Sequence, residues 1–517
     1  MKLKKVLSVI ISLSVVATSC AACNNNQAAN NDTEGTTLRY WVDLSPYAAM
    51  TVTNMAETQL NKTLEEKTGF KIVYEHPPQG QSKENFNLML ASEDLPDIIC
   101  TDWNRYPGGA PKAIYDGYII DHKDVIDKYA PNYKKLLDEN PEVAKLLKTD
   151  DGAYIGFGFI RLDKSLGTSA GPFVRQDWLD DLGLEKPETI DEWTTMLRAF
   201  RDEKGASAPL SFSLAAASWG AFVGAYDTIN GFFIDDGQVK YGPIEPGFKD
   251  FLSLMHSWYE EKLLDSNVGS LNSSMIDSNL LNGETGASTG SIGQTIGRLI
   301  AAAPTPEFDL QPVKYPVLNK GDKPEFGHCG LAFSGTACAI TSTSKNQEAA
   351  AKFLDFGFSE EGHMVYNFGT EGISYEMIDG YPTYTELITK NPDGLSFTAA
   401  MSLYTSSGTG DGAFVQDKRY MEQYSSLPAQ KEAQKLWPDT NALEHALPNL
   451  SLKPEETSEF SRMQNAIDTY RDEMFYKFIL GVEPIDNFDQ YVEHIKQLGI
   501  DKTIGMYQEA LERYNNR

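Results

Sequence analysis

The chain has 517 residues, of which 41% are hydrophobic and 23% charged, values typical of a globular protein and not of a disordered, collagen-like or coiled-coil chain. This length predicts two large domains or about three smaller ones. The 73 acidic and 45 basic residues give a net charge of -28 at pH 7. Such a field repels phosphate backbones, so we expect no nucleic-acid partner.

The N-terminal residues have the pattern of an export signal. Three lysines lie within residues 1–5, an apolar stretch covers 6–17, and small residues surround Cys20 and Cys23. The apolar stretch is shorter than the roughly 20 residues that a membrane-spanning helix needs. We therefore expect residues 1–22 to be a signal peptide.

The two cysteines that follow the apolar stretch resemble a bacterial lipobox. The resemblance implies lipidation at Cys23, with Cys20 as the alternative, although neither has the preferred aliphatic residue three positions earlier. The Asn-rich residues 23–36 then predict a polar tether without a core. Contact with a membrane is expected through the lipid anchor only.

Alternating apolar segments after the tether predict a βαβαβ arrangement and a parallel, doubly wound sheet. Strands are expected at residues 38–42, 70–74 and 97–101, with a helix at 47–68 and another beginning at Ser82. A second such region begins near Pro172. Amphipathic helices are expected at residues 191–202, 246–262 and 344–358, and a long one from Pro454 to Gly481 whose apolar stripe is a core face.

Motifs along the whole chain resemble the extracellular solute-binding proteins of family 1, in the large lipoprotein branch that serves ABC importers of Gram-positive bacteria. The motifs are LASEDLPDII (90–99), DGYIIDHKDVIDKYAPNY (116–133), DGAYIGFGF (151–159), VRQDWLDDLGLEKPETIDEW (174–193), ACAITSTSKNQEAAAKFLDFGFSEEG (337–362), GTEGISYE (369–376), KFILGVEPIDNFDQYVEHIKQLG (477–499) and QEALERY (508–514).

This resemblance implies a two-lobed α/β fold of the periplasmic-binding-protein type, with a hinge, a helix-rich C-terminal region and about three crossings between the lobes. It places lobe 1 at residues 37–160 plus 323–372 and lobe 2 at 161–322 plus 373–517. It implies a carbohydrate ligand, often an oligosaccharide, and delivery to ABC transporter permease subunits. We expect a monomer that is lipid-anchored on the extracellular face of the cell membrane.

One stretch departs from the family pattern. Relatives often carry a calcium-binding loop after the helix that follows DWLDDLGL, and here the matching residues 201–211 (RDEKGASAPLS) offer only Asp202 and Glu203. Calcium takes about six to eight oxygen ligands. We therefore expect no metal there, and no cofactor elsewhere.

The segment TDWNRYPGG (101–109) is the first candidate for ligand contact. It follows a predicted strand at its C-terminal end, where open α/β sheets bind ligands. A sugar offers an apolar ring face to aromatic side chains and hydroxyls to polar ones. The candidate residues are Asp102, Trp103, Asn104, Arg105 and Tyr106. Trp103→Ala is expected to weaken affinity at least tenfold without unfolding the protein, and a structural loop with Trp103 packed inward is the alternative.

Further candidates are spread along the chain, and core packing is the alternative for each of the aromatic ones. Trp41 and Asp43 lie at the end of the first predicted strand, and Tyr375 lies in GTEGISYE. By the resemblance, Trp219 and Phe222 stand where relatives present aromatic residues from the second lobe. Arg161 and Arg175 could meet an acidic sugar, although arginines in an acidic protein more often pair with surface carboxylates; of the two, Arg175 is the candidate.

A secreted glycoside hydrolase is the main alternative function, and a receptor for a peptide or another polar solute is the other. Glycoside hydrolysis needs two carboxylates placed on either side of the bond that is cleaved. A total of 73 acidic residues neither favours nor excludes such a pair. No HExxH motif is present. His328 and Cys329 are adjacent, and in a strand they would point to opposite faces. We expect binding without turnover.

Three cysteines remain once the signal is removed: Cys100, Cys329 and Cys338. Cys329 and Cys338 could pair in an exported protein, but an odd number is not a disulfide framework. Free, buried thiols are the favoured prediction.

Overall fold

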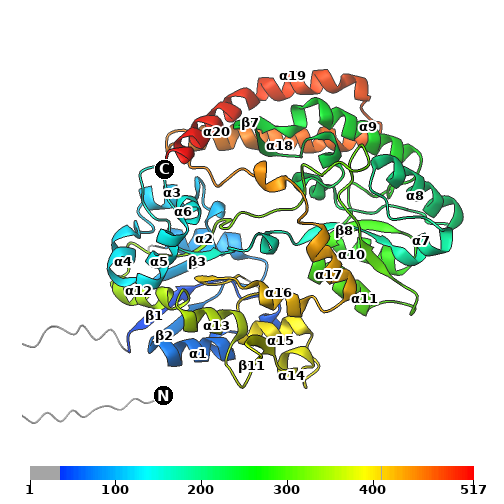
Figure 1. Ribbon diagram of the computed structural model, residues 1–517. Helices are drawn as coiled ribbons and strands as arrows, with labels where there is room; N and C mark the ends of the chain where they lie inside the picture. Colours follow the sequence, from blue (N-terminus) through cyan, green and yellow to red (C-terminus); the bar gives the residue numbers. More distant parts are fainter. Residues whose placement is uncertain (1–34, 93, 409) are drawn as a thin grey trace, which may run out of the picture.

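The computed structural model describes residues 35–92, 94–408 and 410–517. The expected signal peptide, the lipidation site at Cys23 or Cys20 and the tether as far as residue 34 lie outside this range. Figure 1 shows two α/β bodies side by side, one around β1 to β3 and one around β8, with helices α18 to α20 lying across their top. Within the described residues, no helix has both the length and the apolar character needed to cross a membrane.

The strands are β1 (Thr37–Trp41), β2 (Lys71–Glu75), β3 (Ile98–Asp102), β4 (Phe157–Ile160), β5 (Ala170–Arg175), β6 (Phe232–Asp235), β7 (Gln238–Tyr241), β8 (Ala287–Ser291), β9 (Leu310–Pro312), β10 (Thr336–Ile340), β11 (Tyr375–Ile378), β12 (Tyr381–Tyr384) and β13 (Phe414–Val415). The α-helices are α1 (Gln59–Thr68), α2 (Ser82–Ala91), α3 (Gly109–Tyr115), α4 (Lys123–Tyr129), α5 (Pro131–Glu139), α6 (Pro141–Leu146), α7 (Gln176–Leu182), α8 (Ile190–Glu203), α9 (Pro246–Glu260), α10 (Ser273–Leu281), α11 (Arg298–Ala301), α12 (Gln347–Phe356), α13 (Glu360–Phe368), α14 (Glu386–Thr389), α15 (Phe397–Tyr404), α16 (Lys418–Tyr424), α17 (Pro428–Leu436), α18 (Thr457–Ile479), α19 (Phe488–Leu498) and α20 (Ile500–Asn515).

The larger sheet has the strand order β13-β4-β10-β3-β1-β2. β1 runs parallel to both β2 and β3, as the βαβαβ pattern predicts, and the three predicted strands lie within one residue of the observed ones. β10 comes from far along the chain and runs antiparallel between β3 and β4. Ile98 and Ile99 point to opposite faces and are both fully buried, so helices cover this sheet on both sides.

The predicted helix at 47–68 is wrong in its first half. The structure has short 3-10 turns there, and α1 begins only at Gln59. The carboxylate of Glu57 accepts hydrogen bonds from the backbone N–H groups of Thr53 and Asn54, and the Asn54 side chain accepts one from Ala56. These side chains offer the backbone an alternative to helical hydrogen bonds, which ends the helical pattern early. The other long helices predicted after residue 190 are confirmed as α8, α9, α12 and α18.

The smaller sheet has the order β8-β5-β9, and its strands are antiparallel. The expectation of a second parallel region is therefore wrong for these strands, and parallel pairing beside them consists of isolated bridges, at Thr189–Val317, Leu210–Leu264 and Leu210–Ala287. On β5, Phe173 packs toward Leu280 and Trp437, whereas Val174 packs toward the α7–α8 side. Neighbouring residues thus enter two separate cores, and this sheet too is covered on both faces.

The C-terminal helices connect the two bodies. The apolar stripe of α18, including Phe460, Ile467 and Phe478, lies in the core beside the smaller sheet, as predicted. Leu511 and Tyr514 of α20 lie in the core of the larger sheet instead. β13, which the predicted division assigns to lobe 2, pairs with β4 of the larger sheet. The exact lobe boundaries stay a prediction.

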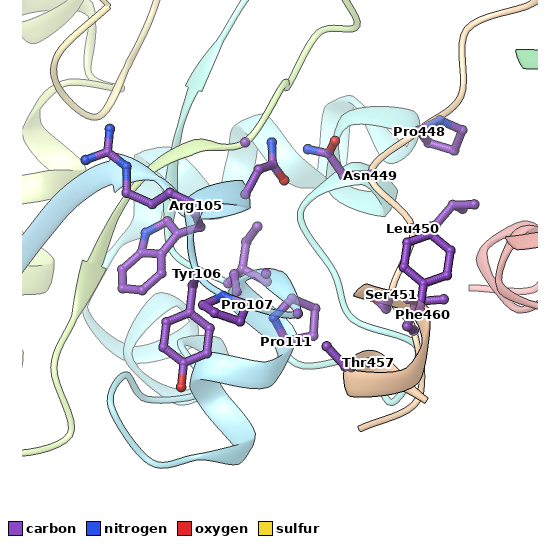
Figure 2. Close-up of a pocket in the computed structure, with 18 of the residues that line it drawn as sticks. Arg105, Tyr106, Pro107, Pro111, Pro448, Asn449, Leu450, Ser451, Thr457 and Phe460 are labelled. Carbon is purple, nitrogen blue, oxygen red and sulfur yellow. The ribbon is translucent and has the colours of Figure 1, made fainter. Parts of the chain in front are cut away.

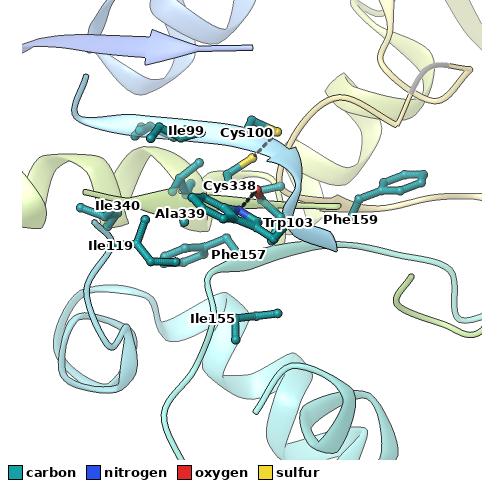
Figure 3. Close-up of a cluster of buried hydrophobic side chains, with 14 of the residues drawn as sticks. Ile99, Cys100, Trp103, Ile119, Ile155, Phe157, Phe159, Cys338, Ala339 and Ile340 are labelled. Carbon is teal, nitrogen blue, oxygen red and sulfur yellow. Dashed lines mark hydrogen bonds between the residues drawn. The ribbon is translucent and has the colours of Figure 1, made fainter. Parts of the chain in front are cut away.

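The three described cysteines are free thiols. Cys100 and Cys338 face each other across β3 and β10 with 2.9 Å between their Sγ atoms (Figure 3), and the Tyr40 hydroxyl lies 3.0 Å from Cys338. Burial raises the pKa of the Cys338 thiol well above its usual range. Cys329 is half-buried in another part of the structure. The prediction of free thiols is confirmed for these residues.

One fully buried histidine couples folding to pH. The His122 ring lies beneath the larger sheet, where its Nε2 accepts a hydrogen bond from the Ile340 N–H at 2.7 Å and its Nδ1 donates to the Tyr154 carbonyl at 3.0 Å. This pairing requires a neutral ring, because a protonated Nε2 has no lone pair for Ile340. Burial lowers the pKa of His122 to about 4.

We expect His122 to make the fold lose stability as the pH falls from 6.5 to 4. In this window the unfolded chain binds a proton that the folded chain excludes, so the loss is about 2–3 kcal/mol by pH 4.5. Chemical denaturation at pH 7.0 and 4.5 measures it. His122→Gln keeps an acceptor for Ile340 and should lose less stability over this interval than the unchanged chain, and equal losses would contradict the assignment.

Candidate functional site

Three cavities adjoin one another between the two sheets, and the segment 326–335 lines all of them. The first, the loop cavity, has a volume of about 500 Å³. The second, the middle cavity, has about 290 Å³ and contains Trp219. The third, the crossover cavity, has about 570 Å³ and lies between Ser291 at the end of β8 and Tyr420 on α16. Together they form an elongated cleft of the size that small ligands occupy.

The chain passes between the two sheets beside this cleft, and two of the crossings are in backbone contact. The Arg161 N–H donates to the Ala332 carbonyl at 2.8 Å. A Cβ atom on Gly167 would lie 2.5 Å from the carbonyl oxygen of Gly330, so the two segments approach more closely than any side chain allows. Tyr315 adds a bridge, because its hydroxyl donates to Ala170 and accepts from the His328 N–H.

Some residues of the predicted loop 101–109 lie at the cleft. Asp102 accepts from the Asn104 N–H at 3.0 Å and so starts a 3-10 turn at Trp103–Arg105. Asn104 donates from Nδ2 to the Ser334 carbonyl at 3.0 Å. Both side chains are exposed. Figure 2 shows Arg105 to Pro111 facing Pro448 to Phe460 across the loop cavity.

A small polar network joins two of the predicted residues. Ser82 donates to the Asp43 carboxylate at 2.6 Å, and Arg105 donates to Ser82 at 2.6 Å while its Nη2 lies 3.5 Å from Asp43. Tyr106 is buried and donates from its hydroxyl to Asp116, which raises the pKa of Tyr106 beyond the effect of burial. Asp43 and Arg105 thus lie together, whereas the Tyr106 hydroxyl is already engaged within its own lobe.

Trp41 and Trp103 lie in the core, and of the two Trp103 borders the loop cavity. They are 4% and 1% exposed, with Phe86 packed between them at ring distances of 5.8 and 6.0 Å. Trp103 donates from its indole to the Ala337 carbonyl at 3.0 Å (Figure 3). The larger sheet is covered on both faces, so an aromatic residue at a strand end is buried whichever way it points.

Of the three predicted residues of the second lobe, one lies at the cleft and two are buried. Trp219 is half-buried in the middle cavity, with its ring edge-on to Tyr315 and His328 at 6.0 and 5.7 Å. Phe222 is fully buried, and its backbone has a positive φ of 60°. Arg175 is buried in an ion pair with Asp177 at 2.5 Å.

Tyr375 lies away from the cleft. It is 6% exposed and packs against Phe368 in a separate cluster. Its surface contributes to a different hollow, beside Lys67. Of the predicted residues, Trp103, Asn104, Arg105, Tyr106 and Trp219 therefore line the cleft, with Asp43 behind Arg105, whereas Asp102 lines none of its three cavities.

Sequence reasoning missed most of the crossover cavity. The lining residues outside the chosen candidates come from four stretches of the chain and are Tyr47, Arg161, Ser169, His328, Gln416, Tyr420 and Tyr424. The sequence makes Arg161 a possible contact of an acidic sugar, but of the two arginines it favours Arg175. The others carried no motif, since their common feature is their position around the crossings.

The charge of the cleft is opposite in sign to that of the chain. Among the described residues, no Asp or Glu lines any of the three cavities, whereas Arg105, Lys148 and Arg161 do. The acidic residues that give the net charge of -28 therefore lie elsewhere. A group of three or more metal-ligating side chains is also missing from the described residues, and Asp202 is ion-paired with Arg201.

His328 and Cys329 both line the crossover cavity, in a segment that is not a strand. The alternation expected of strand neighbours therefore does not apply to them. Burial raises the pKa of Cys329 to about 11 and lowers that of His328. A nucleophilic cysteine needs the opposite, a thiolate at neutral pH.

Comparisons with known proteins agree with this geometry. The family model "Bacterial extracellular solute-binding protein" matches residues 51–364. The fructooligosaccharide ABC transporter substrate-binding protein FusA of Streptococcus pneumoniae is 26% identical over 398 residues, 71% of each chain. The polygalacturonan/rhamnogalacturonan-binding protein YtcQ of Bacillus subtilis is 24% identical over 470 residues, 87% of this chain and 88% of YtcQ.

A solved structure of the alginate-binding protein AlgQ2 superimposes with a TM-score of 0.75 and 23% identity, over 93% of this chain and 98% of AlgQ2. This likeness confirms the expected two-lobed α/β fold.

Substitution of the two tryptophans should distinguish their places in the fold. Trp103→Ala removes a fully buried ring and should lower the free energy of unfolding by about 3–5 kcal/mol. Trp219→Ala removes a half-exposed ring and should lower it by only about 1 kcal/mol. This differs from the sequence-based expectation that Trp103→Ala leaves folding intact. Urea denaturation of both variants measures the difference, and equal losses would place Trp103 outside the core.

The contact between the crossings predicts a cost for any side chain at Gly167. Gly167→Ala should lower the free energy of unfolding by about 1–3 kcal/mol, since the new methyl group overlaps the Gly330 carbonyl. Gly505→Ala is the control, because nothing lies within 4 Å of that position in helix α20 and alanine favours a helix by roughly 0.5–1 kcal/mol. A neutral or stabilising effect at Gly167 would show that the crossings can separate freely.

Proposed function

Because the chain belongs to the family of bacterial extracellular solute-binding proteins, we propose that it captures an oligosaccharide in the cleft between its lobes and delivers it to an ABC transporter permease. The observation that carries this proposal is the cleft itself, in which three adjoining cavities follow the crossings between two separately covered sheets. Lobes joined in this way close on a ligand by rotation about the crossings.

The composition of the cleft supports a carbohydrate ligand. Trp219 and the tyrosines at 47, 420 and 424 offer aromatic surface, while Asn104, Ser334 and Gln416 add hydrogen-bonding groups. This combination suits the apolar ring faces and hydroxyl rims of sugars. FusA and YtcQ are also named for carbohydrate ligands.

Binding without turnover is part of the proposal. Glycoside hydrolysis uses two carboxylates on either side of the bond, and in the described residues the cleft lining contains neither Asp nor Glu. The raised pKa of Cys329 argues against a thiolate nucleophile. These features support a receptor over a hydrolase.

The N-terminal residues support a proposal about the location of the protein. We propose lipidation at Cys23, with Cys20 as the alternative, and a polar tether that holds a monomeric receptor at the extracellular face of the membrane. We further propose that it binds no metal at residues 201–211 and needs no cofactor. The permease subunits are the protein partner in this proposal.

Calorimetric titration of the mature protein against neutral and acidic oligosaccharides tests the function, with each mixture examined afterwards by chromatography for cleavage. We expect saturable binding and intact sugar. Shortened products would mean a hydrolase, and binding of peptides but of no sugar would mean a receptor of another class. Trp219→Ala should weaken sugar affinity about tenfold, or 1.4 kcal/mol. The control Tyr259→Ala removes a half-buried ring from α9, outside the three cavities, and should leave affinity unchanged.

A further inference from the structure

One charged side chain lines the crossover cavity within the described residues, and it is Arg161. It stands at the end of β4, where the chain leaves the larger sheet for the first crossing. His328, the titratable neighbour, stays neutral at pH 7, because burial and the Arg161 charge both lower its pKa. The cavity therefore presents a single positive charge to whatever enters it.

Arg161 is held firmly in place. Its Nε donates to Oε1 of Gln416 at 3.1 Å, and its guanidinium carbon lies 4.7 Å from the centre of the Phe159 ring. Gln416 is itself buried, and it donates from Nε2 to the Tyr420 hydroxyl at 3.1 Å and from its backbone to the Ile160 carbonyl. These contacts fix the guanidinium plane and use one of its five N–H donors.

No carboxylate partners this guanidinium. Every other partly or fully buried arginine in the described residues forms an ion pair, the Arg175–Asp177 and Arg471–Asp468 pairs among them. Arg161 has no described Asp or Glu within 4.0 Å, and its Nη1 and Nη2 atoms make no hydrogen bond with described residues. Burial without an anion lowers the pKa of Arg161. A buried charge that has no ionic partner and leaves most of its N–H donors without a hydrogen bond is costly and is seldom kept for stability alone.

We propose that Arg161 binds a carboxylate of the ligand, so that the captured saccharide is acidic and carries at least one uronic acid. This inference rests on the proposed function and narrows it. Two free Nη atoms in a fixed plane match the two oxygens of a carboxylate, which a neutral hydroxyl does not. The cavity of about 570 Å³ has room for sugar units around that contact. No described carboxylate in the lining opposes the ligand's charge.

The long-range field of the protein does not contradict this assignment. A net charge of -28 repels an anion at a distance, but solvent ions screen exposed charges beyond about 8–10 Å. Contact with a desolvated guanidinium acts at short range and is screened much less. The acidic surface therefore slows association, while the cavity decides which ligand stays bound.

The test compares each acid with its own neutral form. The mature protein is titrated by calorimetry with trimers of galacturonate, mannuronate and glucuronate, and with the same trimers after reduction of their carboxyl groups. We expect at least one acidic trimer to bind at least tenfold more tightly than its reduced form. This comparison needs no variant, so it does not depend on how a substitution affects folding.

Two substitutions at Arg161 then test whether this side chain causes the preference for the acidic trimer. Arg161→Met should remove the preference for the acid, and Arg161→Lys, which keeps the charge but not the planar fork, should reduce it. Arg462→Met removes an exposed arginine of α18 that has no ion pair with described residues, and it should change nothing. Melting temperatures confirm that each variant is folded.

The possible failures are distinguishable. Tighter binding of the neutral trimers would overturn the acidic ligand and leave the sugar receptor standing. A preference for the acid that survives Arg161→Met would overturn the role of Arg161. No binding of any acidic or neutral sugar would refute the proposed function together with this inference.

Discussion

The close contact between the two crossings, at Gly167 and Gly330, is the constraint on which the cleft depends. No side chain fits between these backbones, and the hydrogen bond from Arg161 to Ala332 continues the contact toward the larger sheet. Because the segments are locked side by side, their outward-facing residues line the cavities on either side. The same few residues that join the lobes therefore also form the floor of the site.

The distribution of charge follows from this arrangement. An acidic chain gains solubility from its carboxylates, but a cleft that must desolvate a ligand cannot hold them without partners. The structure keeps most arginines in ion pairs, as with Arg175, and leaves Arg161 unpaired in the crossover cavity. Gln416 and Phe159 orient its guanidinium without neutralising it. In this position the charge is available to a ligand.

The sequence predicted the architecture better than the site, for a physical reason. A strand such as β3 is encoded by consecutive apolar residues, and a helix such as α18 by a repeating stripe, so both can be found from local pattern. The crossover cavity joins segments distant in the chain and has no local pattern. The position of a residue at a strand end predicted part of the site. Asn104 and Arg105, which follow β3, reach the cleft. Trp103 lies beside them but is buried, because Phe86 and β10 cover it. The antiparallel insertion of β10 depends on long-range pairing that periodicity does not encode.

The C-terminal helix adds a second connection between the lobes. Tyr514 of α20 packs in the core of the larger sheet, and Arg513 and Arg517 both pair with Asp150 at 2.7 Å. Further back along α20, Met506 packs in the core beside the smaller sheet. The lobes are thus joined at the crossings and again through α20. A rotation of the lobes that preserves both connections must therefore have its axis through both.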